Sequence, residues 1–120
     1  MMEVAPDRLE SIRRAILAFR DERDWAQFHD PKNLAQGLAI EAAELQEVFL
    51  WKTTDECKRL DAAAVARVRE EVADVFLFSI LLADAFDIDL AEAAQAKIKR
   101  NAEKYPVEKA RGRRDKYTEL

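Results

Sequence analysis

The segment from residue 62 to residue 86 constrains the fold more than any other part of the chain. Its apolar residues recur at steps of three and four, which predicts one long amphipathic helix. The positions expected to face inward are Val65, Val68, Val72 and Val75. From residue 75 to residue 85 the segment is apolar almost all round, and such a helix must be surrounded by others. One short chain supplies few helices, so we expect an interface between copies of the chain.

The composition favours helices throughout. Among 120 residues there are 21 Ala against 16 Val, Ile and Thr, and only 2 Gly and 3 Pro. Ala is the best helix former, whereas β-branched residues prefer strands. This length suits one domain. We therefore predict an all-α fold in a single domain of residues 1–120. It would be an antiparallel bundle of four main helices, assembled as a homo-oligomer, with residues 107–120 as a basic tail.

Three other helices can be placed from their ends and apolar stripes. Asp-x-x-Glu patterns at Asp7 and at Asp89 predict helix starts, with helices from about 7 to 23 and from 89 to before Pro106. Another helix is expected over 31–52, after an irregular loop, and residues 53–61 read as a polar connection. The stripe of the first helix comprises Leu9, Ile12, Ile16 and Phe19, and that of the second comprises Leu34, Leu38, Leu45 and Val48.

Two pairs of acidic residues are the strongest candidates for chemistry. Glu41 and Glu44 lie three residues apart on the second helix, and Glu71 and Asp74 do so on the third. This spacing puts both carboxylates of a pair on one helix face, and antiparallel packing would bring the two pairs together. Four carboxylates repel one another unless a cation lies between them, and an all-oxygen set suits Mg²⁺ or Mn²⁺. Acid pairs on solvated faces are common, but Glu41 lies in the middle of a Leu/Val stripe.

Other classes of site have little support in the sequence. A ferritin-like di-iron bundle needs Glu-x-x-His, zinc sites need Cys and His sets, and the chain has one Cys, one His and no Gly-rich phosphate loop. We found no leader pattern and no apolar run of membrane-spanning length, so a cytoplasmic location without membrane contact is expected. Net charge is −4, although residues 97–117 hold nine basic against three acidic residues, and we expect no nucleic-acid partner.

Aromatic and basic residues outside the acidic pairs suggest a ligand, with simpler structural roles also open. Trp25, Phe28, His29 and Trp51 could stack on a nucleobase or plug the ends of the bundle. In the basic segment, Lys97, Asn101 and Lys104 occupy one helix face and could hold phosphates. The same segment could equally be a solvated tail.

Together these motifs resemble the MazG-like all-α nucleoside triphosphate pyrophosphohydrolases, and most closely their short dCTP-pyrophosphatase-like branch. Glu41-x-x-Glu44 and Glu71-x-x-Asp74 fit the family signature, with 26 residues between the pairs. Further segments that are similar to this branch are Arg23–His29 with Pro31 and Asn33, Phe49-Leu50-Trp51-Lys52, Lys97-x-x-x-Asn101-x-x-Lys104-Tyr105-Pro106, and Lys116–Leu120.

The resemblance implies Mg²⁺-dependent hydrolysis of a nucleoside triphosphate between its α- and β-phosphates, with Mn²⁺ as a possible substitute. It implies that Glu41, Glu44, Glu71 and Asp74 hold the metal and do the catalysis. The substrate-binding residues it implies are Trp25, Phe28, His29, Asn33, Trp51, Phe78, Lys97, Asn101, Lys104 and Tyr105. It also implies a homotetramer, built as a dimer of dimers.

Three positions depart from the pattern of this branch. Phe78 stands where Tyr is frequent, Ile16 where a base-facing His can stand, and Lys104 where Arg is usual. The expected substrate is dCTP or a modified pyrimidine dNTP. The alternative hypothesis is a non-catalytic helical module that mediates interactions.

Overall fold

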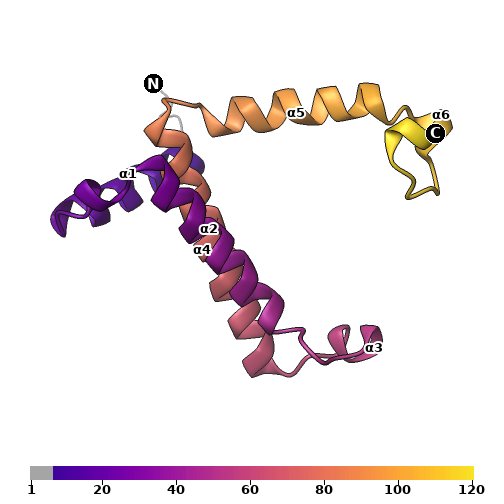
Figure 1. Ribbon diagram of the computed structural model, residues 1–120, viewed down its shortest axis with the longest axis horizontal. Helices are drawn as coiled ribbons and strands as arrows, with labels where there is room; N and C mark the ends of the chain where they lie inside the picture. Colours follow the sequence, from indigo (N-terminus) through magenta and orange to yellow (C-terminus); the bar gives the residue numbers. More distant parts are fainter. Residues whose placement is uncertain (1–6) are drawn as a thin grey trace, which may run out of the picture. The chain divides into compact units, whose positions relative to one another are not determined.

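Helices make up all the regular secondary structure of residues 7–120, the part of the chain that the computed structural model describes (Figure 1). The four long helices are α1 (Arg8–Glu22), α2 (Pro31–Glu47), α4 (Ala62–Ala85) and α5 (Leu90–Lys104). Four short elements connect or follow them: η1 (Ala26–Phe28), α3 (Thr54–Cys57), α6 (Val107–Ala110) and η2 (Tyr117–Glu119). The predicted all-α class is confirmed. Residues 1–6 lie outside this range. The prediction that the chain has no leader pattern concerns this segment.

Aspartates begin the long helices, as the sequence predicts for two of them. The carboxylates of Asp7, Asp30, Asp61 and Asp89 each accept a hydrogen bond from a backbone N–H of the first turn, at 2.8–3.1 Å. Such caps satisfy amide groups that have no partner inside the helix. At α1 the capping box is incomplete. The Glu10 carboxylate accepts hydrogen bonds from Arg13 and Arg14 and not from the backbone amide of Asp7.

The segment after α2 differs from the prediction in two ways. The helix ends at Glu47 and not near Lys52, because the next three amides each bond a carbonyl three residues back and tighten the chain into turns. Trp51 then takes a left-handed backbone conformation, with φ 66°, which no helix can continue. The expected polar connection also contains the short helix α3, whose first turn is capped by the Thr53 hydroxyl at 3.1 Å from the Glu56 amide.

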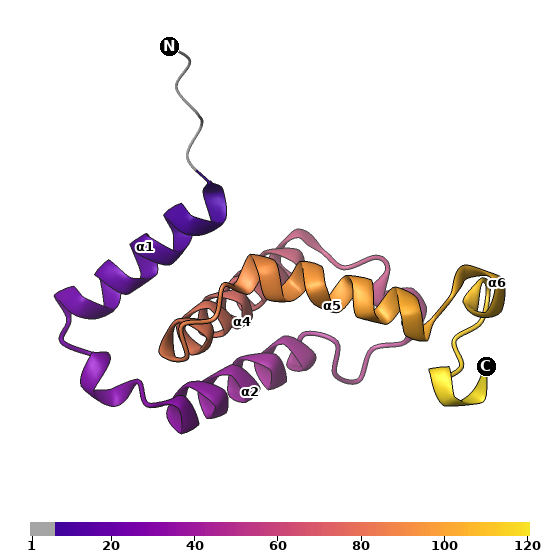
Figure 2. The same cartoon turned by 90° about the horizontal axis from the view of Figure 1, so that it is seen from above.

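The chain divides into two units, and the first ends at Asp87. In this unit α2 and α4 lie side by side and antiparallel along most of their length (Figures 1 and 2). The predicted stripe of α2 faces α4, and its end residues Leu34 and Val48 are only 2% exposed. On α4 the prediction is wrong for Val65 and Val72, which are about half exposed. They lie roughly a quarter-turn away from the strip of α4 that α2 covers.

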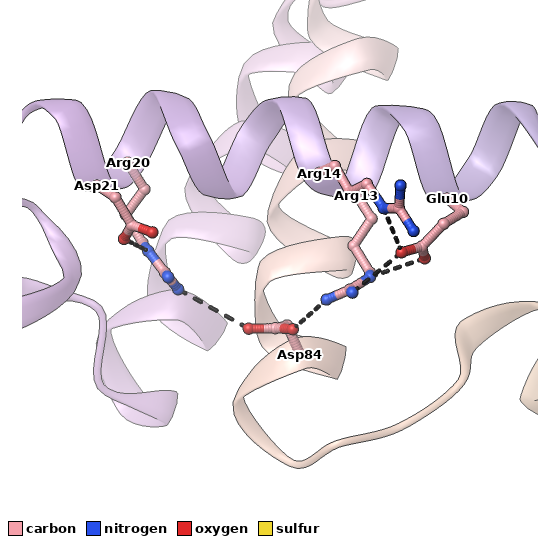
Figure 3. A network of polar contacts seen from close by, with 6 residues as sticks. All are labelled: Glu10, Arg13, Arg14, Arg20, Asp21 and Asp84. Atoms are coloured by element: carbon pink, nitrogen blue, oxygen red, sulfur yellow. Dashed lines mark hydrogen bonds and ion pairs between the residues drawn. The ribbon is translucent and has the colours of Figure 1, made fainter.

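An ion-pair network fastens α1 to the C-terminal end of α4 (Figure 3). The Asp84 carboxylate accepts a hydrogen bond from Arg13 Nη1 at 2.7 Å and lies 3.8 Å from Arg20 Nη1. Glu10 and Asp21 orient the two guanidiniums from within α1. Since Asp84 is only about a quarter exposed, these contacts are worth more than ordinary surface pairs.

The second unit, Ile88–Leu120, contains α5 and the basic segment after it. The last residues return to the end of α5, where the ring of Tyr117 meets Tyr105 edge-on at 5.9 Å between centroids. The Lys104 ammonium lies 4.9 Å from the centroid of the same ring. Residues 107–120, predicted as a basic tail, thus carry local structure of their own.

Replacing Asp84 tests the attachment of α1. We expect Asp84→Asn to lower the free energy of unfolding by about 1–2 kcal/mol, because the arginines lose their shared carboxylate. Thermal and urea unfolding followed by circular dichroism measure this change. Glu70→Gln, on an exposed position of the same helix, is the matched control and should change stability by less than about 0.5 kcal/mol. Equal effects of the two substitutions would contradict the role of Asp84.

Candidate active site

Three of the four predicted acidic residues converge where α2 and α4 pack. Glu41, Glu44 and Glu71 each place a carboxylate oxygen within 4.8 Å of the other two. The helix spacing explains this, because Glu41 and Glu44 lie on the α2 face that α4 covers, and Glu71 lies on the opposing strip. The interface therefore contains an acidic cluster between its apolar layers.

Two oxygens of the cluster are buried and have no hydrogen-bond partner among the described residues: Glu41 Oε2 and Glu71 Oε2. Burial, followed by the nearby carboxylates of Glu44 and Glu71, raises the pKa of Glu41 from 4.5 to about 7. A buried carboxylate without a partner is costly, whereas a divalent cation would satisfy these oxygens and relieve their repulsion. The donor set contains only carboxylate oxygens, which fits a hard cation such as Mg²⁺.

Asp74, the fourth predicted acid, lies near the cluster without belonging to the group of three. Its charge contributes to the raised pKa of Glu41. It also lines a neighbouring cavity, so it lies between the acidic cluster and that cavity. Its predicted part in metal binding and catalysis stays a prediction.

The neighbouring cavity has a volume of about 520 Å³ and is walled by α1, the loop after it and α4. Its lining is mostly apolar, and the predicted stripe of α1 supplies Ile12, Ile16 and Phe19. Three of the predicted ligand-binding residues also line it: Trp25, His29 and Phe78. Phe19 and Trp25 meet edge-to-face at 5.7 Å between ring centroids, which fixes one aromatic wall. A cavity of this size with few polar groups is typical of small-molecule sites.

His29 and Asn33 shape the loop beside this cavity. His29 Nδ1 is buried and has no partner among residues 7–120. Burial and the charge of Arg20 lower the pKa of His29, so its imidazole is neutral at pH 7. The Asn33 side-chain amide donates to the Phe28 carbonyl at 3.2 Å and to the Asp30 carboxylate at 2.9 Å. Asn33 therefore braces the loop, and a contact with a ligand stays a prediction.

The other predicted ligand-binding residues do not line this cavity. Phe28 is 59% exposed, and Trp51, in the turn after α2, is 92% exposed. The turn is closed by Lys52, whose ammonium donates to the Val48 carbonyl at 2.9 Å. The remaining four residues belong to the second unit: Lys97, Asn101, Lys104 and Tyr105. For all of them a substrate-binding role stays a prediction.

Sequence reasoning missed Ala15 and Arg20 of α1, and Leu77 and Leu81 of α4, as parts of the cavity wall. The two leucines belong to the run that is apolar all round, so periodicity could not say which side of it borders a cavity. A signal for Arg20 existed. Arg20 lies seven residues after Arg13 and hence on the same face of α1. Both arginines can reach Asp84, the acid that ends the apolar run of α4.

Comparisons with known proteins point to one family. Residues 38–120 match the MazG-like family. The chain is 40% identical over 114 residues to dCTP pyrophosphatase 1 of Mus musculus and 41% identical to that of Homo sapiens, covering 93% of this chain and 67% of each relative. It is also similar to the crystal structure of a pyrophosphatase from Archaeoglobus fulgidus, with a TM-score of 0.81 and 36% identity over 88% of this chain and 99% of that one.

The chain therefore belongs to the MazG-like family. This confirms the family that the motifs predict, and it supports the expected enzyme class, a nucleoside triphosphate pyrophosphohydrolase. Within residues 7–120, no helix combines the length and the apolar character that a membrane span requires.

The raised pKa of Glu41 predicts how stability depends on pH in metal-free protein. The folded state holds the Glu41 proton up to about pH 7, whereas the unfolded chain releases it near pH 4.5. This contribution to stability is therefore complete below about pH 4.5 and is lost as the pH rises through 7. We expect the melting temperature in EDTA to fall over this range, and Glu41→Gln to flatten the fall.

Thermal unfolding at steps of half a pH unit, with Glu70→Gln as control, measures this effect. The control should keep the slope of the wild-type protein. An identical slope in Glu41→Gln would show that other groups cause the pH dependence.

Proposed function

We propose that the chain hydrolyses dCTP, or a modified pyrimidine dNTP, between the α- and β-phosphates in a Mg²⁺-dependent reaction. The products are the nucleoside monophosphate and pyrophosphate. The observation that carries this proposal is the acidic cluster with two unpartnered buried oxygens beside an aromatic cavity. The names of the relatives, dCTP pyrophosphatase 1, supply the substrate class.

In this proposal Glu41, Glu44, Glu71 and Asp74 hold the metal, and Mn²⁺ is a possible substitute. A bound divalent ion would neutralise phosphate charge and activate the attacking water. The carboxylates orient that water, and one of them accepts its proton.

The apolar cavity is proposed to receive the nucleobase. Phe78 and Trp25 offer aromatic faces for stacking, and the neutral His29 imidazole can hydrogen-bond a base edge. Asp74 lies at the boundary of the cavity and the acids, so a base in the cavity directs its phosphates toward the cluster. The proposed phosphate and sugar contacts are Lys97, Asn101, Lys104 and Tyr105.

We also propose that the working enzyme is a homotetramer, a dimer of dimers, in the cytoplasm. The exposed apolar residues Val65, Val72 and Phe76 on α4 support an interface between copies. In such an assembly, Phe28 and Trp51 of one copy would line the substrate site of another copy.

Removing one carboxylate of the cluster tests the metal site. We expect Glu41→Gln and Glu71→Gln each to reduce Mg²⁺-dependent release of pyrophosphate from dCTP by at least about a hundredfold, because metal and water lose a ligand. Both variants should stay folded by circular dichroism. Glu70→Gln is the neighbouring control and should retain wild-type turnover. Unchanged turnover in both cluster variants would refute this site, and a screen of common and modified dNTPs measures base preference.

Thermal stabilisation separates the enzyme from the alternative, a non-catalytic interaction module. A ligand that binds only the folded state stabilises it by about 2.7 kcal/mol at a hundred times its dissociation constant. We expect Mg²⁺ with a non-hydrolysable α,β-methylene analogue of dCTP to raise the melting temperature of wild-type protein. Glu41→Gln should lose this rise and Glu70→Gln should keep it. An interaction module would show no rise in any of the three proteins.

A further inference from the structure

Gly37 occupies an unfavourable position, the interior of α2, where glycine is destabilising by about 1 kcal/mol relative to alanine. The reason for a glycine there is the aromatic ring of Phe78 on α4. A Cβ atom built on Gly37 would lie 2.5 Å from Cε1 and 2.8 Å from Cζ of that ring. Ordinary contacts begin near 3.4 Å, so any larger residue would displace the ring by about 1 Å.

The Phe78 ring separates α2 from the apolar cavity. It contacts Gly37 of α2, and it also lines the cavity, whose other walls come from α1, the following loop and α4. None of the described residues that line the cavity belongs to α2. A side chain at position 37 therefore pushes the ring away from α2 and toward the cavity, and the end of a phenylalanine side chain can make this movement.

The same pair lies in register with the acidic cluster. Gly37 is one helical turn before Glu41, and Phe78 is one turn after Asp74, so both residues continue the antiparallel α2–α4 contact. The position of the ring relative to the acids is thus fixed by the closeness of the two helices. The distance from the acids to the far end of the cavity therefore depends on where the Phe78 ring lies.

We propose that Gly37 is a positioning residue that sets the depth of the cavity through Phe78 and so limits the size of the ring that can bind. This inference rests on the proposed function for its choice of ligand. Gly37 itself touches no substrate and acts only through the ring. Its glycine therefore serves ligand selection at the expense of helix stability.

A double-mutant cycle tests the coupling of the two residues. The proteins are wild type, Gly37→Ala, Phe78→Leu and the double variant, with Gln36→Ala as an exposed control on α2. We expect Gly37→Ala to raise the KM for dCTP about tenfold while kcat changes less than twofold, because the cavity becomes shallower and the acids stay in place. When Phe78→Leu is already present, the same change should alter KM less than twofold, and Gln36→Ala should change neither constant.

Two readouts do not depend on activity. The melting temperature of Gly37→Ala should stay near that of wild type, because the gain in helix propensity offsets the cost of moving the ring. In methyl spectra of the ligand-free protein, the Ile12 and Ile16 resonances should shift in Gly37→Ala and remain unchanged in Gln36→Ala, because ring currents act over short distances.

Equal KM changes on Gly37→Ala with and without the Phe78→Leu substitution would overturn the proposal, as would an unchanged KM. Unshifted methyl resonances in Gly37→Ala would overturn its structural basis. If the wild-type protein does not release pyrophosphate from dCTP, the proposed function fails. The methyl shifts then decide separately whether Gly37 positions the ring.

Discussion

The antiparallel contact between α2 and α4 is the constraint on which the first unit depends. The same two faces bury Leu34 and Val48 and bring carboxylates together in the layer between them. Apolar burial stabilises the contact, whereas the unpartnered oxygens of Glu41 and Glu71 oppose it. A metal-free chain therefore retains a local conflict, which a divalent cation would remove. This arrangement ties stability of the helix pair to the occupancy of the candidate site.

The contact between α1 and α4 has a different character. Its charged end is well paired, because Asp84 accepts from Arg13 at 2.7 Å, but its apolar part surrounds a cavity of about 520 Å³. The charged network can hold α1 in place without filling the space beneath it. Phe78 closes the cavity toward α2. Its side chain therefore takes part both in the α2–α4 contact and in the cavity between α1 and α4.

Local features could be predicted from the sequence, whereas most long-range contacts could not. Asp7 and Asp89 cap helices as their patterns indicate, and the α2 stripe around Glu41 faces α4 as expected. The early end of α2 was missed, because its apolar pattern continues into turns that the left-handed Trp51 terminates. The partners of Asp84 were missed because the shared helix face of Arg13 and Arg20 does not say which acid, 71 positions from Arg13, they meet. The approach of the two acidic pairs was predictable because both lie on long helices, which were expected to pack antiparallel.

Trp51 links the candidate site to the question of assembly. A non-glycine residue with φ 66° is strained by about 1–2 kcal/mol, and a tryptophan exposed by 92% leaves a large apolar surface in water. The Lys52 bond to the Val48 carbonyl holds this turn closed, so the exposure is built into the end of α2. Within one unit the cavity already has Phe19, Trp25 and Phe78 and lacks any contribution from Trp51. In the proposed tetramer, a second copy of the chain would supply that partner surface.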